Sequence, residues 1–257
     1  MSKVYAIISG KGGVGKTTTS INLGTALRYL GEDVIIVDAN LTTPNIGIHL
    51  GAPIVPITLN HVLDNAAKVE DAIYEHETGT KIMPASLSLK DTQRINYKKL
   101  STVTNKLKKM SDHIILDSPA GLGEEARHAI DAADDIIIIA NPEMASVTDA
   151  LKTIKLAEEK NKNIIGAIIT RYSGNKTDMS INNIKDMLEV PILGIIPEDI
   201  AVKESQILKN AVINTHPKSP SSRNYIDASR RLLGEDVKMN LGRDGVFTII
   251  LKTLLLR

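Results

Sequence analysis

The chain has 257 residues, enough for one large α/β domain with a substantial core. It contains no cysteine, which excludes disulfides, thiolate metal sites and cysteine-ligated iron–sulfur clusters. The formal net charge of +1 argues against a mainly electrostatic nucleic-acid binder, and aromatic residues make up only 3% of the chain, so we expect an aliphatic core.

The first predicted elements are a buried strand over residues 4–8, a glycine-rich loop, and a helix over residues 18–30. The loop contains Gly10-x-x-x-x-Gly15-Lys16-Thr17, a complete P-loop. Its glycines let backbone N–H groups turn inward around a phosphate. Lys16 supplies charge for β- and γ-phosphates, and the Thr17 hydroxyl is placed to hold Mg²⁺. The residues predicted to contact a nucleotide here are Gly10, Lys11, Gly12, Gly13, Val14, Gly15, Lys16, Thr17 and Thr18.

Short runs rich in isoleucine and valine alternate with amphipathic segments along the rest of the chain. Continuous apolar strands are typical of a parallel sheet that is covered on both faces. We therefore predict an α/β fold, a mostly parallel sheet with helices on both faces, with ligands at the carboxyl ends of the strands. The predicted strands are 34–37, 81–83, 114–116, 136–140, 164–169 and 192–196, and the predicted helices lie near 98–110, 122–132, 147–160, 180–189, 200–210 and 221–233.

Two aspartates follow buried strands of this pattern. Asp38 comes after residues 34–37, and Asp117 comes after residues 114–116. Both are expected where the metal of the P-loop would lie, because magnesium prefers a few carboxylates together with waters and phosphates. Each aspartate is equally placed to cap a helix at a strand–helix turn. The predicted metal residues are Thr17, Asp38 and Asp117.

The composition changes after Gly234, so we divide the chain into a P-loop domain, residues 1–234, and a linker with a C-terminal tail, residues 235–257. Gly242 and Gly245 bracket a hinge. The apolar run beyond it is too short to span a bilayer but suits an interfacial amphipathic helix. The alternative is a tail docked on the core or on a dimer partner. The residues that fall on one arc of a helix are Val246, Phe247, Ile250, Leu251 and Leu254.

The segment Lys11-Gly12-Gly13-Val14-Gly15-Lys16-Thr17-Thr18 resembles the deviant Walker A motif of the MinD/ParA family of dimeric ATPases. Asp117-Ser118-Pro119-Ala120-Gly121 resembles switch II of MinD proteins, and residues 38–45 resemble their switch I. The resemblance covers about residues 2–234. It implies ATP and Mg²⁺ as cofactors, and a dimer in which Lys11 reaches the phosphates of the partner's nucleotide. A solvated loop lysine is the alternative for Lys11.

One departure from the family concerns the chemistry. Most members have D-x-D in switch I, where the second aspartate is thought to orient or polarise the attacking water, but this chain has Asn40. An amide can orient water but cannot accept a proton as a carboxylate does. We therefore expect hydrolysis to be slow or to depend on another group. The residues assigned to the reaction are Lys11, Lys16, Asp38, Asn40 and Asp117.

Further family positions concern the ribose and the base. The resemblance implies that Glu143 approaches the ribose across the dimer, and that adenine lies beside Arg171 and the loop Pro197-Glu198-Asp199. Asn175-Lys176-Thr177-Asp178 matches the guanine-reading pattern N-K-x-D, but it comes about five residues after its predicted strand. We interpret it as a loop whose polar residues cap the next helix, and we favour ATP over GTP.

The resemblance implies an ATP-dependent, dimerising ATPase switch that associates with the membrane through its tail and helps to position the division site. We expect an unidentified protein activator or division regulator as a partner, and no sequence-specific nucleic acid. No signal peptide or membrane span is expected, so the protein is predicted to be cytoplasmic, peripheral to the inner face of the cell membrane. The alternatives are a ParA-type DNA-partition ATPase, a flagellar-placement regulator and a slowly hydrolysing nucleotide-binding scaffold.

Overall fold

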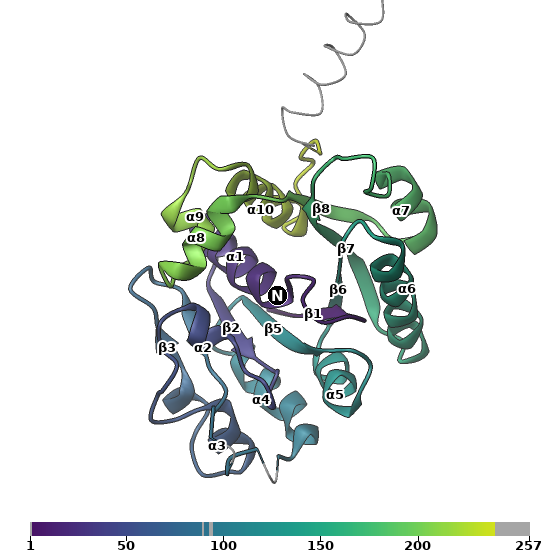
Figure 1. Ribbon diagram of the computed structural model, residues 1–257. Helices are drawn as coiled ribbons and strands as arrows, with labels where there is room; N and C mark the ends of the chain where they lie inside the picture. Colours follow the sequence, from purple (N-terminus) through teal and green to yellow (C-terminus); the bar gives the residue numbers. More distant parts are fainter. Residues whose placement is uncertain (1, 89, 93–94, 240–257) are drawn as a thin grey trace, which may run out of the picture.

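The strands gather into one sheet that crosses the middle of the molecule (Figure 1). The structure is a computed structural model and describes residues 2–88, 90–92 and 95–239. Within these residues the strands are β1 (Lys3–Ser9), β2 (Val34–Asp38), β3 (Tyr74–Glu75), β4 (Lys81–Met83), β5 (His113–Ala120), β6 (Asp135–Ala140), β7 (Asn163–Tyr172) and β8 (Ile192–Pro197). Their order is β3-β4-β2-β5-β1-β6-β7-β8, and only the β3–β4 pair is antiparallel among these described strands.

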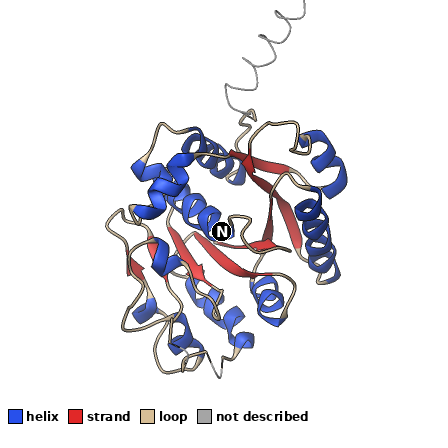
Figure 2. Cartoon of the chain, in the orientation of Figure 1, coloured by secondary structure: helices blue, strands red, loops and turns tan. Residues whose placement is uncertain are grey.

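Helices connect the strands and lie on both sides of the sheet (Figure 2). The segments predicted from the amphipathic pattern all form helices, with ends that differ by a few residues. The short helices α2, α3 and α9 were not predicted. The described helices are α1 (Lys16–Tyr29), α2 (Ile46–His49), α3 (Leu59–Leu63), α4 (Leu100–Leu107), α5 (Glu124–Ala132), α6 (Met144–Glu159), α7 (Ile181–Leu188), α8 (Ile200–Ile207), α9 (Val212–Thr215) and α10 (Pro220–Leu232), with 3₁₀ turns at Glu70–Ala72 and Tyr97–Lys99.

Alternate side chains of each strand enter two different apolar layers. In β1, Val4, Ala6 and Ile8 pack with α3 to α7, whereas Tyr5 and Ile7 pack with α1, α2 and α8 to α10. This alternation follows from the two-residue period of a strand, and burial on both faces explains why the strands read as unbroken apolar runs. The predicted fold class is therefore confirmed.

Three strands differ from the prediction. The two-residue strand β3 was missed, because it is too short to give a periodic signal. β5 continues past Asp117 to Ala120, and β7 continues past Thr170 to Tyr172. Both extensions contain polar residues of the site, so hydrophobicity alone ended these strands too early.

β8 forms one edge of the sheet, and α10 supplies donors to its carbonyl groups. Asn224 Nδ2 donates to the carbonyl oxygen of Ile195 (2.6 Å), and Arg231 donates to that of Leu193 (2.8 Å). Arg231 also donates to the carbonyl oxygens of Val237 and Lys238, both at 2.8 Å. The first residues after the predicted domain boundary at 234 are therefore held against the edge of the sheet.

The predicted tail, residues 246–257, lies outside the described residues.

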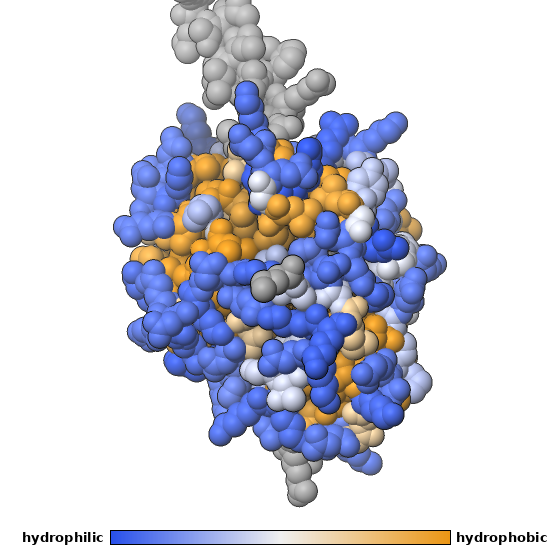
Figure 3. Space-filling view, turned by 180° about the vertical axis from the view of Figure 1, so that it is seen from behind, coloured by the Kyte–Doolittle hydropathy of each residue, from blue (hydrophilic) through white to orange (hydrophobic). Residues whose placement is uncertain are grey.

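Seen from behind (Figure 3), hydrophobic residues gather in the half of the molecule that contains β8 and α10. Met239, the last described residue, lines one groove with Ile181 and Ile192. Over the described part of the chain, every helix falls short of the length and hydrophobicity that a membrane span requires.

Candidate functional site

The P-loop joins β1, in the middle of the sheet, to the first turn of α1. Gly13 and Gly15 have φ angles of 77° and 95°, which glycine adopts without the steric cost that a side chain would add. Gly10 is required for a different reason. A Cβ atom at this position would lie 2.4 Å from the carbonyl oxygen of Asp149 in α6. One glycine of the pattern that predicted phosphate binding is therefore also required because α6 lies close to the loop.

Lys16 lies inside the loop with only 8% of its surface exposed. Its Nζ donates to Ser9 Oγ at 2.8 Å, and Ser9 Oγ donates to the carbonyl oxygen of Lys11 at 2.7 Å. Burial lowers the pKa of Lys16, and the charge of Asp117 partly opposes this shift. A lysine in this position has lost much of its hydration, so it interacts strongly with an anion that enters the loop.

Asp38 and Asp117 face each other in adjacent strands and are fully buried. Asp117 Oδ2 accepts the hydroxyl of Thr17 at 2.6 Å, and its Oδ1 accepts that of Ser20 at 3.0 Å. Asp38 Oδ2 accepts the N–H groups of Asn45 and Ile46, both at 2.9 Å. Neutral donors thus satisfy most of the oxygen atoms of both carboxylates.

This burial raises the pKa of both carboxyl groups. For Asp38, burial has the largest effect and the neighbouring charge of Asp117 adds to it, against the N–H groups of the following loop. For Asp117, burial is opposed by the hydroxyl of Thr17, by Lys16 and by Ser20. A divalent cation beside these groups would compensate both charges, so Thr17, Asp38 and Asp117 fit the predicted metal site. Within the described residues, histidine and acidic side chains form no cluster of three or more that could hold a metal unaided.

Asn40 lies in the tight turn that follows β2. Its Nδ2 donates to the carbonyl oxygen of Thr43 at 2.6 Å, and its Oδ1 accepts the hydroxyl of Thr43 at 2.9 Å. Both ends of the amide are therefore engaged in its own turn. An aspartate could not make the first of these bonds, because a carboxylate has no donor.

The second lysine of the loop lies in a different environment. The Lys11 side chain is 49% exposed, and its Nζ lies 3.8 Å from Glu143 Oε2, whose side chain is 59% exposed. Two residues that the resemblance assigns to the dimer interface thus lie side by side at the surface. Their contact is long and solvated, so it adds little to stability.

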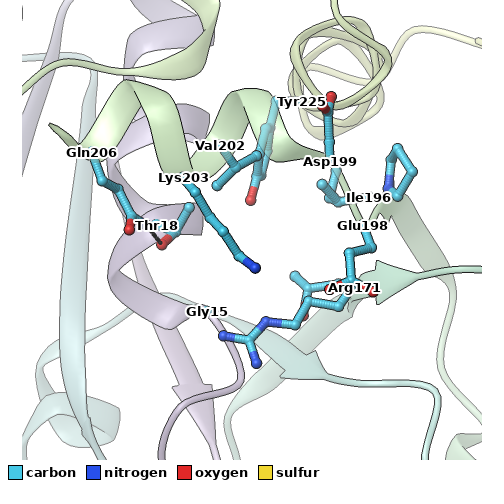
Figure 4. A pocket seen from close by; sticks show the side chains of 12 residues that line it. Gly15, Thr18, Arg171, Ile196, Glu198, Asp199, Val202, Lys203, Gln206 and Tyr225 are labelled. Atoms are coloured by element: carbon cyan, nitrogen blue, oxygen red, sulfur yellow. Dashed lines mark hydrogen bonds between the residues drawn. The ribbon is translucent and has the colours of Figure 1, made fainter. Parts of the chain in front are cut away.

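A cavity opens next to the P-loop, between α8 and the ends of β7 and β8 (Figure 4). The side chains of Arg171 and Lys203 extend into it, and Pro197 borders it. Arg171 has a φ angle of 55°, which is uncommon for a residue with a side chain and occurs at the end of β7. The cavity is thus where the resemblance places the base. Its lining residues are Gly15, Thr18, Thr170, Arg171, Ile196, Pro197, Glu198, Asp199, Val202, Lys203, Gln206 and Tyr225.

Asp199 lines this cavity, but its carboxylate is bound to the protein. Its Oδ1 caps α8 by accepting the N–H of Ala201 at 3.0 Å. Its Oδ2 accepts the hydroxyl of Ser221 at 2.7 Å and the N–H of Ser221 at 3.1 Å. Burial alone would raise the pKa of Asp199, but these hydrogen bonds together hold it below its usual range. The side chain therefore fixes the loop at 197–199 against α10.

The N-K-x-D match has a similar structural role. Asp178 Oδ2 accepts hydrogen bonds from Ser173 Oγ (2.8 Å), Ser173 N–H (2.7 Å) and Gly174 N–H (2.9 Å). Ser180 caps α7 by accepting the N–H of Asn183. The carboxylate that would read guanine is directed into its own loop, in agreement with the interpretation from the sequence.

Comparison with known proteins places this site in a family. The family model for the CobQ/CobB/MinD/ParA nucleotide binding domain matches residues 5–212, which include the P-loop, both aspartates and every residue that lines the cavity except Tyr225. The chain belongs to this family. The MinD structure of Pyrococcus horikoshii complexed with Mg-ADP is similar to it, with a TM-score of 0.87 and 32% identity over 92% of this chain and 100% of that one.

Two further relatives are informative. An uncharacterised ATP-binding protein of Methanocaldococcus jannaschii is 37% identical over 94% of this chain and 91% of its own length. The MinC:MinD cell division complex of Aquifex aeolicus contains a chain with a TM-score of 0.85 and 32% identity, matched over 93% of this chain and 98% of that one. The predicted resemblance to the MinD/ParA family is therefore confirmed.

Sequence reasoning missed several residues of the site. Lys203 and Gln206 come from α8, and Gln206 Nε2 donates to Thr18 Oγ1 at 3.1 Å. Tyr225 comes from α10, is buried, and lies 3.3 Å from Thr19 Oγ1 through its hydroxyl. The helical spacing of residues 199, 203 and 206 places them on one side of a helix, which is a weak signal that could have indicated α8. No local pattern indicates Tyr225, because it approaches from a distant part of the chain.

Proposed function

We propose that this chain is a dimerising ATPase switch, which binds ATP with Mg²⁺, dimerises while ATP is bound, and hydrolyses ATP slowly until a partner activates it. The observation that carries this proposal is the contrast between two lysines of one loop. Lys16 is buried beside Asp117, whereas Lys11 is half-exposed beside Glu143. Lys16 alone completes a P-loop, so the second lysine is available to a nucleotide held by another copy.

The residues around Lys16 fit the magnesium and phosphate chemistry. Thr17 and Asp117 would hold the ion together with the phosphates, and Asp38 would lie beside them. When bound, Mg²⁺ neutralises charge that develops on the transferred phosphoryl group. Lys16 orients the phosphates, and the buried carboxylates fix the metal side of the site.

Sedimentation of the chain with ATP or ADP tests the dimerisation. The parent protein should sediment as a dimer with ATP and as a monomer with ADP. Lys11→Ala should still bind ATP but remain monomeric and inactive, whereas Lys98→Ala, which removes an exposed lysine elsewhere, should behave like the parent. Equal dimerisation of Lys11→Ala and the parent would refute the cross-dimer role.

We further infer that residues 246–257 attach the protein to the cytoplasmic face of the membrane, and that it helps to position the division site together with a protein partner. Three findings support this: the spacing of apolar residues in the tail sequence, the MinD relatives, and the MinC:MinD complex of the related A. aeolicus protein. Burying five such side chains gains at most ~8–15 kcal/mol, and ordering the tail costs a comparable ~10–15 kcal/mol. One tail is therefore marginal, and two tails on one dimer bind by avidity.

Deletion of residues 243–257 tests this attachment. The truncated chain should keep its melting temperature and ATP affinity but no longer sediment with anionic liposomes. The intact chain should bind liposomes better with ATP than with ADP. Equal lipid binding in both nucleotides would rule out the avidity mechanism, and a large loss of thermal stability on truncation would show that the tail packs on the core.

A second candidate function is a nucleotide-binding scaffold that hardly turns over. Asn40 favours it, because the amide replaces a carboxylate and both of its ends are engaged in the turn at Thr43. Phosphate release measured with and without liposomes separates the two functions. A switch should release phosphate faster on lipid with its partner present, whereas a scaffold should show the same negligible rate under all conditions.

A further inference from the structure

Glu125, in the first turn of α5, reaches the loop that follows β2. Its Oε1 accepts hydrogen bonds from the N–H of Leu41 and, at 3.2 Å, from the N–H of Thr42. Its Oε2 accepts the hydroxyl of Thr42 at 2.6 Å. One carboxylate of α5 therefore binds three donors of a loop 84 residues away in the chain.

This contact joins the two segments that follow the buried aspartates. The bound loop begins immediately after Asp38 and Asn40, and α5 begins shortly after the strand that carries Asp117. Asp38 holds the far end of the loop through the N–H groups of Asn45 and Ile46, and Asn40 closes the turn at Thr43. Those bonds come from the loop and its own strand, whereas Glu125 adds a charged acceptor from a separate helix.

The chemistry of the contact makes its hydrogen bonds strong, and they restrict the backbone next to Asn40. Hydrogen bonds to a carboxylate are shorter and about twice as strong as neutral ones. The two N–H groups belong to the peptides directly after Asn40, so the position of this carboxylate restricts the backbone that carries the Asn40 amide. An amide that orients water must itself be fixed, because it cannot compensate for poor geometry by accepting a proton.

We propose that Glu125 is a positioning residue for hydrolysis: it fixes the loop that carries Asn40 and couples the movement of that loop to α5. The proposal rests on the proposed ATPase function. Glu125 contacts the loop that carries Asn40 rather than the P-loop, so its removal should act on the catalytic rate more than on nucleotide affinity. Movement of α5 on binding a partner would then reach Asn40 through this carboxylate.

Hydrogen exchange of the nucleotide-free protein tests the contact itself. Glu125→Ala should speed exchange of the Leu41 and Thr42 amides by about tenfold, because each loses a charge-assisted hydrogen bond. Glu124→Ala is the matched control, since Glu124 lies in the same first turn of α5 but is 77% exposed and contacts His128. Unchanged exchange at Leu41 and Thr42 in Glu125→Ala would overturn the proposal.

Steady-state phosphate release tests the positioning role. Glu125→Ala should lower kcat by about tenfold while KM changes by less than about twofold. Glu125→Gln keeps acceptor capacity and should give an intermediate kcat, and Thr42→Val, which removes the hydroxyl, should have no further effect in the Glu125→Ala background. An unchanged kcat, or equal losses in Glu124→Ala and Glu125→Ala, would overturn the role.

The two experiments separate this proposal from the function on which it rests. If the parent chain releases no phosphate with any partner or lipid, the ATPase function fails, and the exchange rates still decide whether Glu125 holds the loop. If the parent is active and Glu125→Ala exchanges as the parent does, the function stands and the positioning role fails.

Discussion

Acidic side chains lie at both ends of the central strands, but they are neutralised in different ways. At the amino end, Lys3 binds Asp135 and Lys108 binds Asp134, each with an N–O distance of 2.8 Å. At the carboxyl end, Asp38 and Asp117 are fully buried, and hydroxyl and N–H groups satisfy most of their oxygen atoms. The charges at the amino end are thus paired within the folded chain, whereas an added cation and phosphate would compensate the charges at the carboxyl end.

This difference separates stability from function. An ion pair whose two partners both belong to the chain contributes to the stability of the fold, and its charges are not available to bind a ligand. Two buried carboxylates next to a buried lysine cost folding free energy, and that cost is recovered when a metal and an anion arrive. Substitutions at the two ends should therefore change different measurements.

The largest effect is expected at the carboxyl end. Lys16→Ala should lower ATP affinity by about 100-fold, since truncating one partner of a buried charge pair costs ~2–5 kcal/mol. Isothermal titration calorimetry measures this loss, and Lys3→Ala at the amino end is the control that should keep the parent affinity. ATP binding by Lys16→Ala within about threefold of the parent would contradict the contrast between the two ends.

The next effect concerns the rate of reaction at the same end. Asn40→Asp should raise phosphate release by about 10–100-fold, because it restores a carboxylate that can accept a proton. The hydrogen bond to the carbonyl of Thr43 is lost, so the gain should lie at the lower end of this range. Asn105→Asp adds the same charge at an exposed position of α4 and serves as the control. No change in rate would show that another step limits turnover.

The smallest effect is expected at the amino end. Asp134→Asn should lower the free energy of unfolding by about 0.5–1 kcal/mol, a small value because the Asp134 side chain is 35% exposed and solvent screens the pair. Urea denaturation measures the loss, and ATP affinity should not change. A double-mutant cycle with Lys108→Met isolates the pair, and additive effects in that cycle would contradict its contribution.

The pH dependence of that contribution follows from the pKa of Asp134. Partial burial by itself would raise this pKa, but the hydrogen bonds from Lys108 and the N–H of Val4, with the charges of Lys108 and Lys3, hold it below its usual range. A depressed carboxyl pKa adds stability above the unfolded value of about 3.9, and this stability is lost as the pH falls through the folded value. The parent and Asp134→Asn should therefore converge in stability below about pH 4.

Much of the phosphate site could be predicted because its signals are local. A strand, a glycine-rich turn and a helix follow one another in residues 3–29, so the P-loop is specified within one stretch of sequence. Asp38 and Asp117 were found because each follows a buried run, and parallel strands bring their carboxyl ends to one edge. The pairing of these two aspartates in adjacent strands agrees with that reasoning.

The cavity beside the P-loop could be predicted only in part, and the contact of Glu125 with Leu41 and Thr42 could not be predicted at all. Arg171 and the loop at 197–199 were found by resemblance, but the hydrogen bonds between Asp199 and Ser221 depend on how α10 packs on β8 and α1. Tyr225 and Glu125 lie in unremarkable helical sequence, where an aromatic or acidic residue usually belongs to the core or to the solvated surface. Only their long-range contacts distinguish them.

The sequence by itself determined the fold class, the P-loop and the family, because hydrophobic period, glycine spacing and charged residues at fixed intervals act over a few turns of the chain. The tertiary structure decided which groups those residues meet: the burial of Lys16 against the exposure of Lys11, and the contacts of Glu125 with Leu41 and Thr42. Such partners are set by helix packing across the sheet, which brings together residues that no local pattern relates.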